Sequence, residues 1–204
     1  VGSATWHVPI IVRARVNSKI VESRLLLEDD EATIDLGGTP DWVVVNAGGH
    51  GFYRVSYSRA LREALSARAL DVLSEAERYG LVDDTWSAVL AGELEAGEHI
   101  ALVTSLASET DLAVWQRILS SLEHLHSIAD DAGRRRMTVL IRDLSTTGLG
   151  VLGFEPIEGE PDLDRELRGA LFAAAGTTGC DASVREIAKT LFGQATTGTA
   201  VEPN

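Results

Sequence analysis

The chain has 204 residues, 45% of them hydrophobic and 24% charged, which is typical of a globular protein with a buried core rather than of a disordered chain. Its 31 acidic and 18 basic residues give a formal net charge of −13, which would repel a nucleic-acid backbone, so we expect no nucleic-acid partner. A single cysteine, Cys180, excludes an internal disulfide, and no segment approaches the roughly 20 apolar residues of a membrane-spanning helix, so we expect a cytoplasmic protein without a membrane partner.

The first quarter of the chain has the pattern of short strands. Apolar runs separated by turn residues lie at residues 8–16, 25–27, 34–36, 42–45 and 52–57. Three consecutive valines, Val43 to Val45, supply apolar groups to both faces of their strand, which suits a sheet covered on both sides. About five strands are few for a two-sheet sandwich, so residues 1–57 are predicted to form an incomplete β-sandwich. An incomplete sandwich exposes an edge strand, and we therefore expect this chain to be capable of dimerisation.

From residue 58 onward, apolar residues recur three and four positions apart, which predicts helices. Ser74 and Glu77 have the spacing of a capping box, which marks the start of a helix. Further apolar stripes predict helices at residues 82–90, 102–106, 115–125, 137–144, 164–175 and 183–192. The Thr-Thr-Gly tripeptides that begin at Thr146, Thr177 and Thr196 are interpreted as helix exits.

Short, glycine-containing links between these helices favour antiparallel pairs stacked as an irregular α-solenoid. The predicted fold class is therefore α+β, with a small partial β-sandwich at residues 1–57 followed by an all-α superhelical domain at residues 58–204. The chain begins at Val1 rather than at a methionine, and its tail after Phe192 ends before any closing helix. Because a solenoid needs a capped last repeat, we interpret the chain as a piece of a longer protein.

The sequence has no local signature of catalysis or metal binding. A zinc peptidase would need H-E-x-x-H on a helix, where two histidines four residues apart share one face. None of the five histidines has this spacing, and His124 and His126 would point about 200° apart on a helix. Cys180 precedes a helix, but a single thiol is a weak indication of nucleophilic chemistry. We predict no catalytic, metal-binding or cofactor-binding residue in this chain.

Two clusters suggest ligand sites but have simpler interpretations. The glycine-rich residues 46–51 resemble a phosphate loop, yet the segment that follows has the pattern of a strand, so a tight hairpin is the better interpretation. The basic run from Arg134 to Arg136 follows two aspartates and is interpreted as a solvated stretch at the start of a helix.

The hairpin residues resemble a motif of a known enzyme family. Asn46 followed by Gly51-Phe52-Tyr53-Arg54-Val55-Ser56-Tyr57 is similar to the N-x-x-x-x-G-F-Y-R-V-x-Y hairpin of aminopeptidase N and its relatives, the gluzincin zinc aminopeptidases. Weaker similarity, in the same order as in that family, occurs at residues 6–10, 73–78, 80–84, 109–111 and 115. The resemblance therefore covers nearly the whole chain, although only the hairpin motif is specific.

The resemblance implies that the chain is the end of the small β-sandwich domain and the start of the helical domain of such an enzyme. The family's zinc ligands, its G-x-M-E-N loop and its catalytic tyrosine lie upstream of this region, so the resemblance implies that zinc belongs to the parent enzyme and that this chain alone is inactive. The implied role of the helical part is to enclose the peptide cavity and limit substrate access. The implied partners are the upstream zinc domain and the peptide substrate.

The motif residues are interpreted as structural, with sandwich packing and an ion pair at the junction between sandwich and helices. They are Asn46, Gly51, Tyr53, Arg54, Tyr57, Asp83 and Asp84. The alternative function is a free-standing helical-repeat module that binds a protein partner and has no enzymatic activity.

Overall fold

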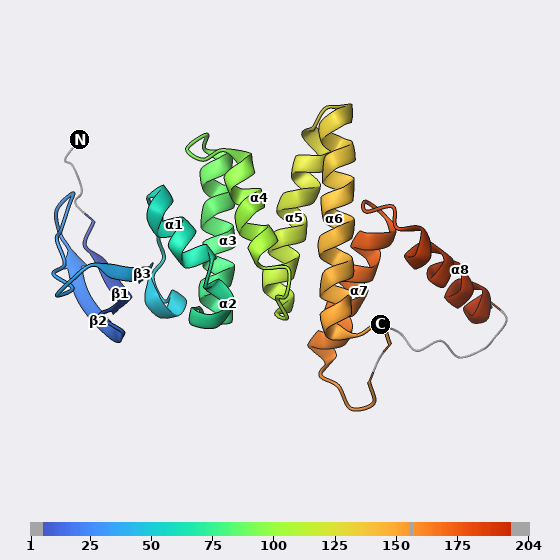
Figure 1. The fold of residues 1–204 in the computed structure, drawn as a ribbon, viewed down its shortest axis with the longest axis horizontal. Coiled ribbons are helices and arrows are strands. Elements are labelled where there is room, and N and C mark those ends of the chain that lie inside the picture. The colour runs from blue at the N-terminus through green and yellow to red at the C-terminus, as the bar shows by residue number, and fades with distance from the viewer. Residues whose placement is uncertain (1–5, 156, 197–204) are drawn as a thin grey trace. The chain divides into compact units, whose positions relative to one another are not determined.

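The computed structural model describes residues 6–155 and 157–196. Within these residues it contains a three-stranded sheet, a short 3-10 turn and eight α-helices. The chain divides into two compact units, residues 1–102 and 103–204 (Figure 1). The predicted α+β class is confirmed. None of the described helices is both long and apolar enough to cross a bilayer.

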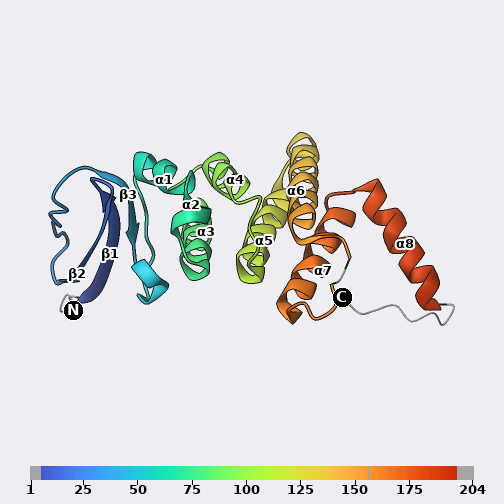
Figure 2. The ribbon, with the colours of Figure 1, turned by 60° about the horizontal axis from the view of Figure 1, so that its bottom comes forward.

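Unit 1 begins with an antiparallel sheet of strand order β2-β1-β3, built from β1 (Val8–Val16), β2 (Lys19–Leu27) and β3 (Pro40–Val45). Figure 2 shows β1 between the other two strands. Asn17 and Ser18 join β1 to β2 with φ values of 49° and 64°, as a two-residue turn between right-twisted strands requires. The register runs without a bulge from Val8 opposite Leu27 to Val16 opposite Lys19.

Both faces of β3 are covered, as the run of valines predicted. Val43 packs with a cluster of buried residues on β1, namely Val12, Ala14 and Val16. Val44, which points to the opposite face, is only 3% exposed. The described residues form one sheet, with helices beside its second face.

Two predicted strands are wrong. Residues 34–36 lie in the connection between β2 and β3, and residues 52–57 form a connection without strand pairing ahead of the first helix. In the first segment the apolar pattern reflects burial rather than a ladder, since Ile34 and Leu36 pack against the cluster around Val12. The predicted hairpin at residues 46–51 is also wrong, because a 3-10 turn, η1 (Ala47–Gly49), occupies that place.

The helices of unit 1 follow the expected pattern. α1 (Arg59–Ser66) and α2 (Ala69–Val72) are short, α3 (Glu75–Leu90) is the main helix, and α4 (Ala96–Ser105) continues into unit 2. The predicted capping box at the start of α3 is confirmed. The Ser74 hydroxyl accepts a hydrogen bond from the Glu77 amide at 3.4 Å, and the Glu77 carboxylate accepts one from the Ser74 amide at 2.9 Å.

Unit 2 contains α5 (Leu112–Ile128), α6 (Asp131–Leu152), α7 (Asp162–Gly176) and α8 (Ala182–Thr196). α6 packs against both α5 and α7, as Figures 1 and 2 show, and α7 also contacts α8. The helices predicted in this region are confirmed, and α6 extends well beyond its predicted end. The exposed run from Arg134 to Arg136 lies near the start of α6, as expected.

The Thr-Thr-Gly that begins at Thr146 is not a helix exit, because it lies inside α6. The hydroxyl of Thr146 donates to the Arg142 carbonyl at 2.9 Å, which keeps the threonine compatible with the helix. The glycine of this tripeptide, Gly148, allows close packing: a Cβ there would lie 2.9 Å from Trp115 on α5 and 3.0 Å from Leu171 on α7. The tripeptide at Thr177 does follow the end of α7.

Candidate functional site

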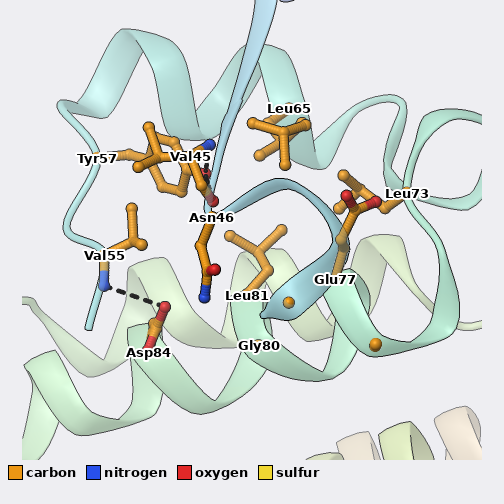
Figure 3. A pocket seen from close by; sticks show the side chains of 13 residues that line it. Val45, Asn46, Val55, Tyr57, Leu65, Leu73, Glu77, Gly80, Leu81 and Asp84 are labelled. Atoms are coloured by element: carbon orange, nitrogen blue, oxygen red, sulfur yellow. Dashed lines mark hydrogen bonds between the residues drawn. The ribbon is translucent and has the colours of Figure 1, made fainter. Parts of the chain in front are cut away.

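The seven motif residues predicted from the sequence all lie at one place in unit 1. Here the end of β3, the turn η1 and residues 51–57 meet α3, and we call this place the junction (Figure 3). Its side chains come from segments that are distant in sequence, such as those of Arg54 and Asp84, which are 30 residues apart. The junction therefore fixes the connection between the sheet and the helices of unit 1.

Asn46 closes the loop that leads out of β3. Its backbone is left-handed, with φ 62°, a conformation that asparagine tolerates better than most residues. The side-chain oxygen of Asn46 accepts from the Gly51 amide at 2.6 Å, and the side-chain nitrogen donates to the Gly51 carbonyl at 3.0 Å. A Cβ at Gly51 would lie 2.1 Å from the Tyr53 ring. The spacing of asparagine and glycine in the motif therefore has a steric and a hydrogen-bonding cause.

Tyr57 binds the last residue of β3. Its hydroxyl accepts from the Val45 amide at 2.8 Å and donates to the Val45 carbonyl at 3.4 Å. Backbone groups at a sheet edge otherwise need water or another strand. Burial raises the pKa of Tyr57 to about 12, although its hydrogen bond with Val45 acts in the opposite direction. Burial also raises the pKa of Tyr53, whose ring lies against Gly51.

Arg54 ties the segment after the loop to the middle of α3. Its guanidinium forms ion pairs with Asp83 and, at 3.2 Å, with Asp84, while the second Asp84 oxygen accepts from the Val55 amide at 3.1 Å. Burial raises the pKa of Asp84 and outweighs the opposing effect of Arg54 and Val55. The Arg54 side chain itself is 60% exposed. We call Arg54, Val55, Asp83 and Asp84 the outer joint.

Glu77 is the centre of a second, more deeply buried set of contacts. Its carboxylate accepts from both terminal nitrogens of Arg13 at 2.9 and 2.8 Å, from the Gly48 amide at 2.7 Å and from the Ser74 amide at 2.9 Å. Burial acts to raise the pKa of Glu77, but these donors outweigh it and lower the pKa. We call Arg13, Gly48, Ser74 and Glu77 the inner joint.

The inner joint was not found from the sequence. The capping box identified Glu77 as a local partner of Ser74, but Arg13 lies 64 residues away from it along the chain. One signal was available: Arg13 stands in the strand VPIIVRARV, between apolar residues of a sheet that is covered on both sides. An arginine in such a strand needs a carboxylate or carbonyl partner.

A small cavity of about 30 Å³ lies between the two joints. Apolar side chains form most of its wall, together with the polar residues Asn46, Glu77 and Asp84 (Figure 3). A cavity of this volume is sufficient for a water molecule, and far smaller than the several hundred Å³ of a ligand pocket. Its polar groups bond to Arg13, to Arg54 and to backbone groups, so this small cavity is not a substrate site.

Comparison with known proteins gives a consistent result. The family described as the ERAP1-like C-terminal domain matches residues 42–204. Aminopeptidase M1-A of Oryza sativa subsp. japonica is 28% identical in an alignment of 196 positions that covers 91% of this chain and 22% of the rice protein. Puromycin-sensitive aminopeptidase of Caenorhabditis elegans is 26% identical over 99% of this chain and 22% of its own length. Aminopeptidase 2 of Candida albicans is 27% identical over 96% of this chain.

The chain thus spans about a fifth of the length of these relatives. The match to the family begins within β3 and includes the seven motif residues and every described helix. Since it covers most of the chain, the chain belongs to the ERAP1-like C-terminal domain family.

Proposed function

We propose that this chain is a C-terminal part of a zinc metalloaminopeptidase, a hydrolase that removes N-terminal residues from peptides. The observation that carries the proposal is the extent of the similarity: relatives named as aminopeptidases align with 91% or more of this chain but with only 22% of their own length. A region that matches only part of each longer enzyme corresponds to one portion of that enzyme.

The reaction is assigned to a zinc domain elsewhere in that longer protein. Within residues 6–155 and 157–196, no three histidine, cysteine, aspartate or glutamate side chains are grouped so that they could hold a metal ion. The carboxylates of the junction are engaged by Arg13, Arg54 and backbone amides. We therefore assign no step of peptide hydrolysis to a residue of this chain.

The role that we propose for the chain is to position a helical domain beside the zinc domain. In this proposal the sheet is part of a β-sandwich, and the helices form a superhelical domain that encloses the peptide cavity and limits access to it. Enclosure excludes water, which strengthens electrostatic interactions at a metal centre. The partners are then the zinc domain and the peptide substrate, and the lone thiol suits a reducing cytoplasm.

The test is hydrolysis of an aminoacyl chromogenic amide in the presence of zinc. We expect no turnover from the 204-residue chain and zinc-dependent turnover from the same chain extended upstream to the length of its relatives. Zinc-dependent turnover by the 204-residue chain alone would show that the assignment of the chemistry is wrong. Absence of turnover from a folded, zinc-loaded long form would favour a non-enzymatic helical module instead.

A second measurement tests the enclosing role separately. In the long form, Glu77→Ala removes the central carboxylate of the inner joint and leaves the zinc ligands unchanged. Glu75→Ala is a matched control at an exposed position of the same helix. If the helices enclose the cavity, the Glu77 variant should change the ratio of kcat/KM values for long and short peptides, and the control should leave it unchanged. An unchanged ratio in both variants would argue against enclosure.

A further inference from the structure

No other described strand pairs with the outer edge of β2. Within the described residues β2 pairs only with β1, and its nine residues include neither a proline nor a bulge. The two-residue turn makes Val16 and Lys19 a hydrogen-bonded pair, so the odd-numbered residues of β2 direct their amides and carbonyls toward β1. The even-numbered residues direct theirs outward, where another strand can add.

The side chains of these even-numbered residues form a distinctive order on one face of the strand. Ile20 and Leu26 are 59% and 52% exposed. Between them, Arg24 donates to the Glu22 carboxylate at 3.1 and 3.0 Å. The order along the edge is therefore apolar, acidic, basic, apolar, which is complementary to itself when the strand is reversed.

We propose that β2 pairs antiparallel with β2 of a second copy of this chain, about a two-fold axis that passes through Ser23. In this register Ile20 lies opposite the partner's Leu26, and Glu22 lies opposite the partner's Arg24. Each of these pairs joins residues with outward-facing backbone, so each exchanges two backbone hydrogen bonds. On the other face of the strand, Val21 meets the partner's Leu25.

The charges select this register over its neighbours. A shift of the partner by two residues in one direction places Glu22 opposite the partner's Glu22, and in the other direction places Arg24 opposite the partner's Arg24. Like charges directly opposite each other destabilise a strand pair. A shift by one residue pairs outward-facing backbone with inward-facing backbone and breaks the ladder. Of these registers, the two-fold register alone places opposite charges and apolar side chains opposite one another and also forms the backbone hydrogen bonds.

The symmetry favours a second copy over an unrelated strand as the occupant of this edge. A two-fold interface requires one surface patch to be complementary to itself, and the residues between Ile20 and Leu26 meet that condition. A single added strand is a small interface, and association must offset lost translational and rotational freedom. The dimer is therefore weak and concentration-dependent. This inference does not depend on the proposed peptidase function.

Sedimentation equilibrium of the 204-residue chain, up to about 1 mM and at about 0.15 M salt, is the first test. We expect a monomer–dimer equilibrium. Glu22→Arg and Arg24→Glu should each weaken dimerisation about tenfold, because each places like charges opposite one another. Mixing the two variants should restore a heterodimer, and the double exchange in one chain should restore the homodimer.

Glu63→Arg and Arg59→Glu are matched controls, since they reverse charges in an exposed ion pair on α1. They should leave the dimer unchanged. A chain that is monomeric at every concentration would overturn the proposal. So would a dimer that the Glu22 and Arg24 variants do not weaken, because its interface must lie elsewhere.

A cross-link tests the register itself, in a Cys180→Ser background. Ser23 faces the partner's Ser23 as a non-hydrogen-bonded pair, with about 4.5 Å between Cα atoms, which is within the range that a disulfide spans. Ser23→Cys should therefore form a disulfide-linked dimer on mild oxidation. Lys19→Cys is the control, since the two copies of position 19 would lie roughly 26 Å apart along the strands. Equal cross-linking at both positions would overturn the two-fold register.

Discussion

The inner and outer joints of the junction attach the same helix by similar chemistry but in different surroundings. In the inner joint, the Glu77 side chain is 2% exposed and accepts hydrogen bonds from Arg13 and two backbone amides. In the outer joint, the Arg54 side chain is 60% exposed, and Asp84 accepts from Arg54 and one amide. The pKa of Glu77 is lowered and that of Asp84 is raised, although burial acts to raise both.

The difference follows the donors and the charges that surround each carboxylate. Glu77 has enough donors to offset desolvation, so its charged form is the favoured one. Asp84 has fewer donors and the like charge of Asp83 beside it, so burial prevails and its charged form is disfavoured despite the adjacent Arg54. The inner joint should therefore contribute most of the stability of the junction, and the outer joint should mainly orient the chain.

The largest expected effect follows from removing the Glu77 carboxylate. Glu77→Ala leaves the Arg13 guanidinium without its carboxylate and the Gly48 and Ser74 amides without their acceptor. Breaking a buried ion pair from one side costs about 3–5 kcal/mol. Urea unfolding at pH 7 should show a loss of this size, and Glu75→Ala, which removes a carboxylate 67% exposed, should change the free energy of unfolding by less than about 0.5 kcal/mol.

A comparison of wild type with Glu77→Ala at different pH values tests the role of the ionised carboxylate. Because the pKa of Glu77 is lowered in the folded state, its stabilising contribution is present above its ordinary pKa of 4.5 and is lost as the pH falls through the lower folded value. The difference in unfolding free energy between the wild type and Glu77→Ala should therefore shrink below pH 4.5. A difference that stays constant from pH 7 to pH 3 would contradict the role assigned to the ionised carboxylate.

A smaller effect is expected at Asn46, in the loop between the two joints. Asn46→Ala loses both hydrogen bonds to Gly51 and places alanine in a left-handed conformation, so the free energy of unfolding should fall by about 2–3 kcal/mol. Asn46→Gly loses the same bonds without the backbone strain and should cost about 1 kcal/mol less. Equal losses in the two variants, measured by urea unfolding, would show that the left-handed backbone is not a source of the effect.

Tyr57 links the loop to the edge of β3, and its contribution should depend on alkaline pH. Tyr57→Phe removes two hydrogen bonds to Val45 and should cost about 1 kcal/mol near pH 8. The pKa of Tyr57 is raised to about 12, so the contribution of the protonated phenol is fully present below its ordinary pKa of 10.0 and is lost as the pH rises toward 12. The difference between wild type and variant should therefore narrow from pH 10 to pH 12.

These residues also show how far sequence reasoning reached. The capping box of Ser74 and Glu77 was predictable because its partners lie three residues apart and follow a local rule. The contact between Arg13 and Glu77 was not, because nothing local connects residues 64 positions apart. Residues 52–57 were assigned to a strand because strands and buried extended connections share an apolar pattern, and only the absence of a ladder distinguishes them.

The helical half shows a related limit. The six apolar stripes predicted helices because each helix buries one face. The end of α6 was not predicted, because the Thr-Thr-Gly that begins at Thr146 was interpreted as a helix exit and lies inside the helix. Gly148 in that tripeptide serves close packing against Trp115 and Leu171, which lie in two other helices. A glycine that permits contact between helices and a glycine that ends one look alike in a single sequence.

The smallest expected effect is at the outer joint, and it separates the two joints most sharply. Arg54→Ala removes an exposed ion pair with Asp83 and Asp84, so it should cost less than about 1 kcal/mol, and 1 M salt should reduce that cost further. The cost of Glu77→Ala should change less with salt, because the Glu77 side chain is only 2% exposed. If Arg54→Ala instead destabilised the chain as much as Glu77→Ala and without salt dependence, the outer joint would also be a stabilising contact, and donor number alone would not explain the opposite pKa shifts of Glu77 and Asp84.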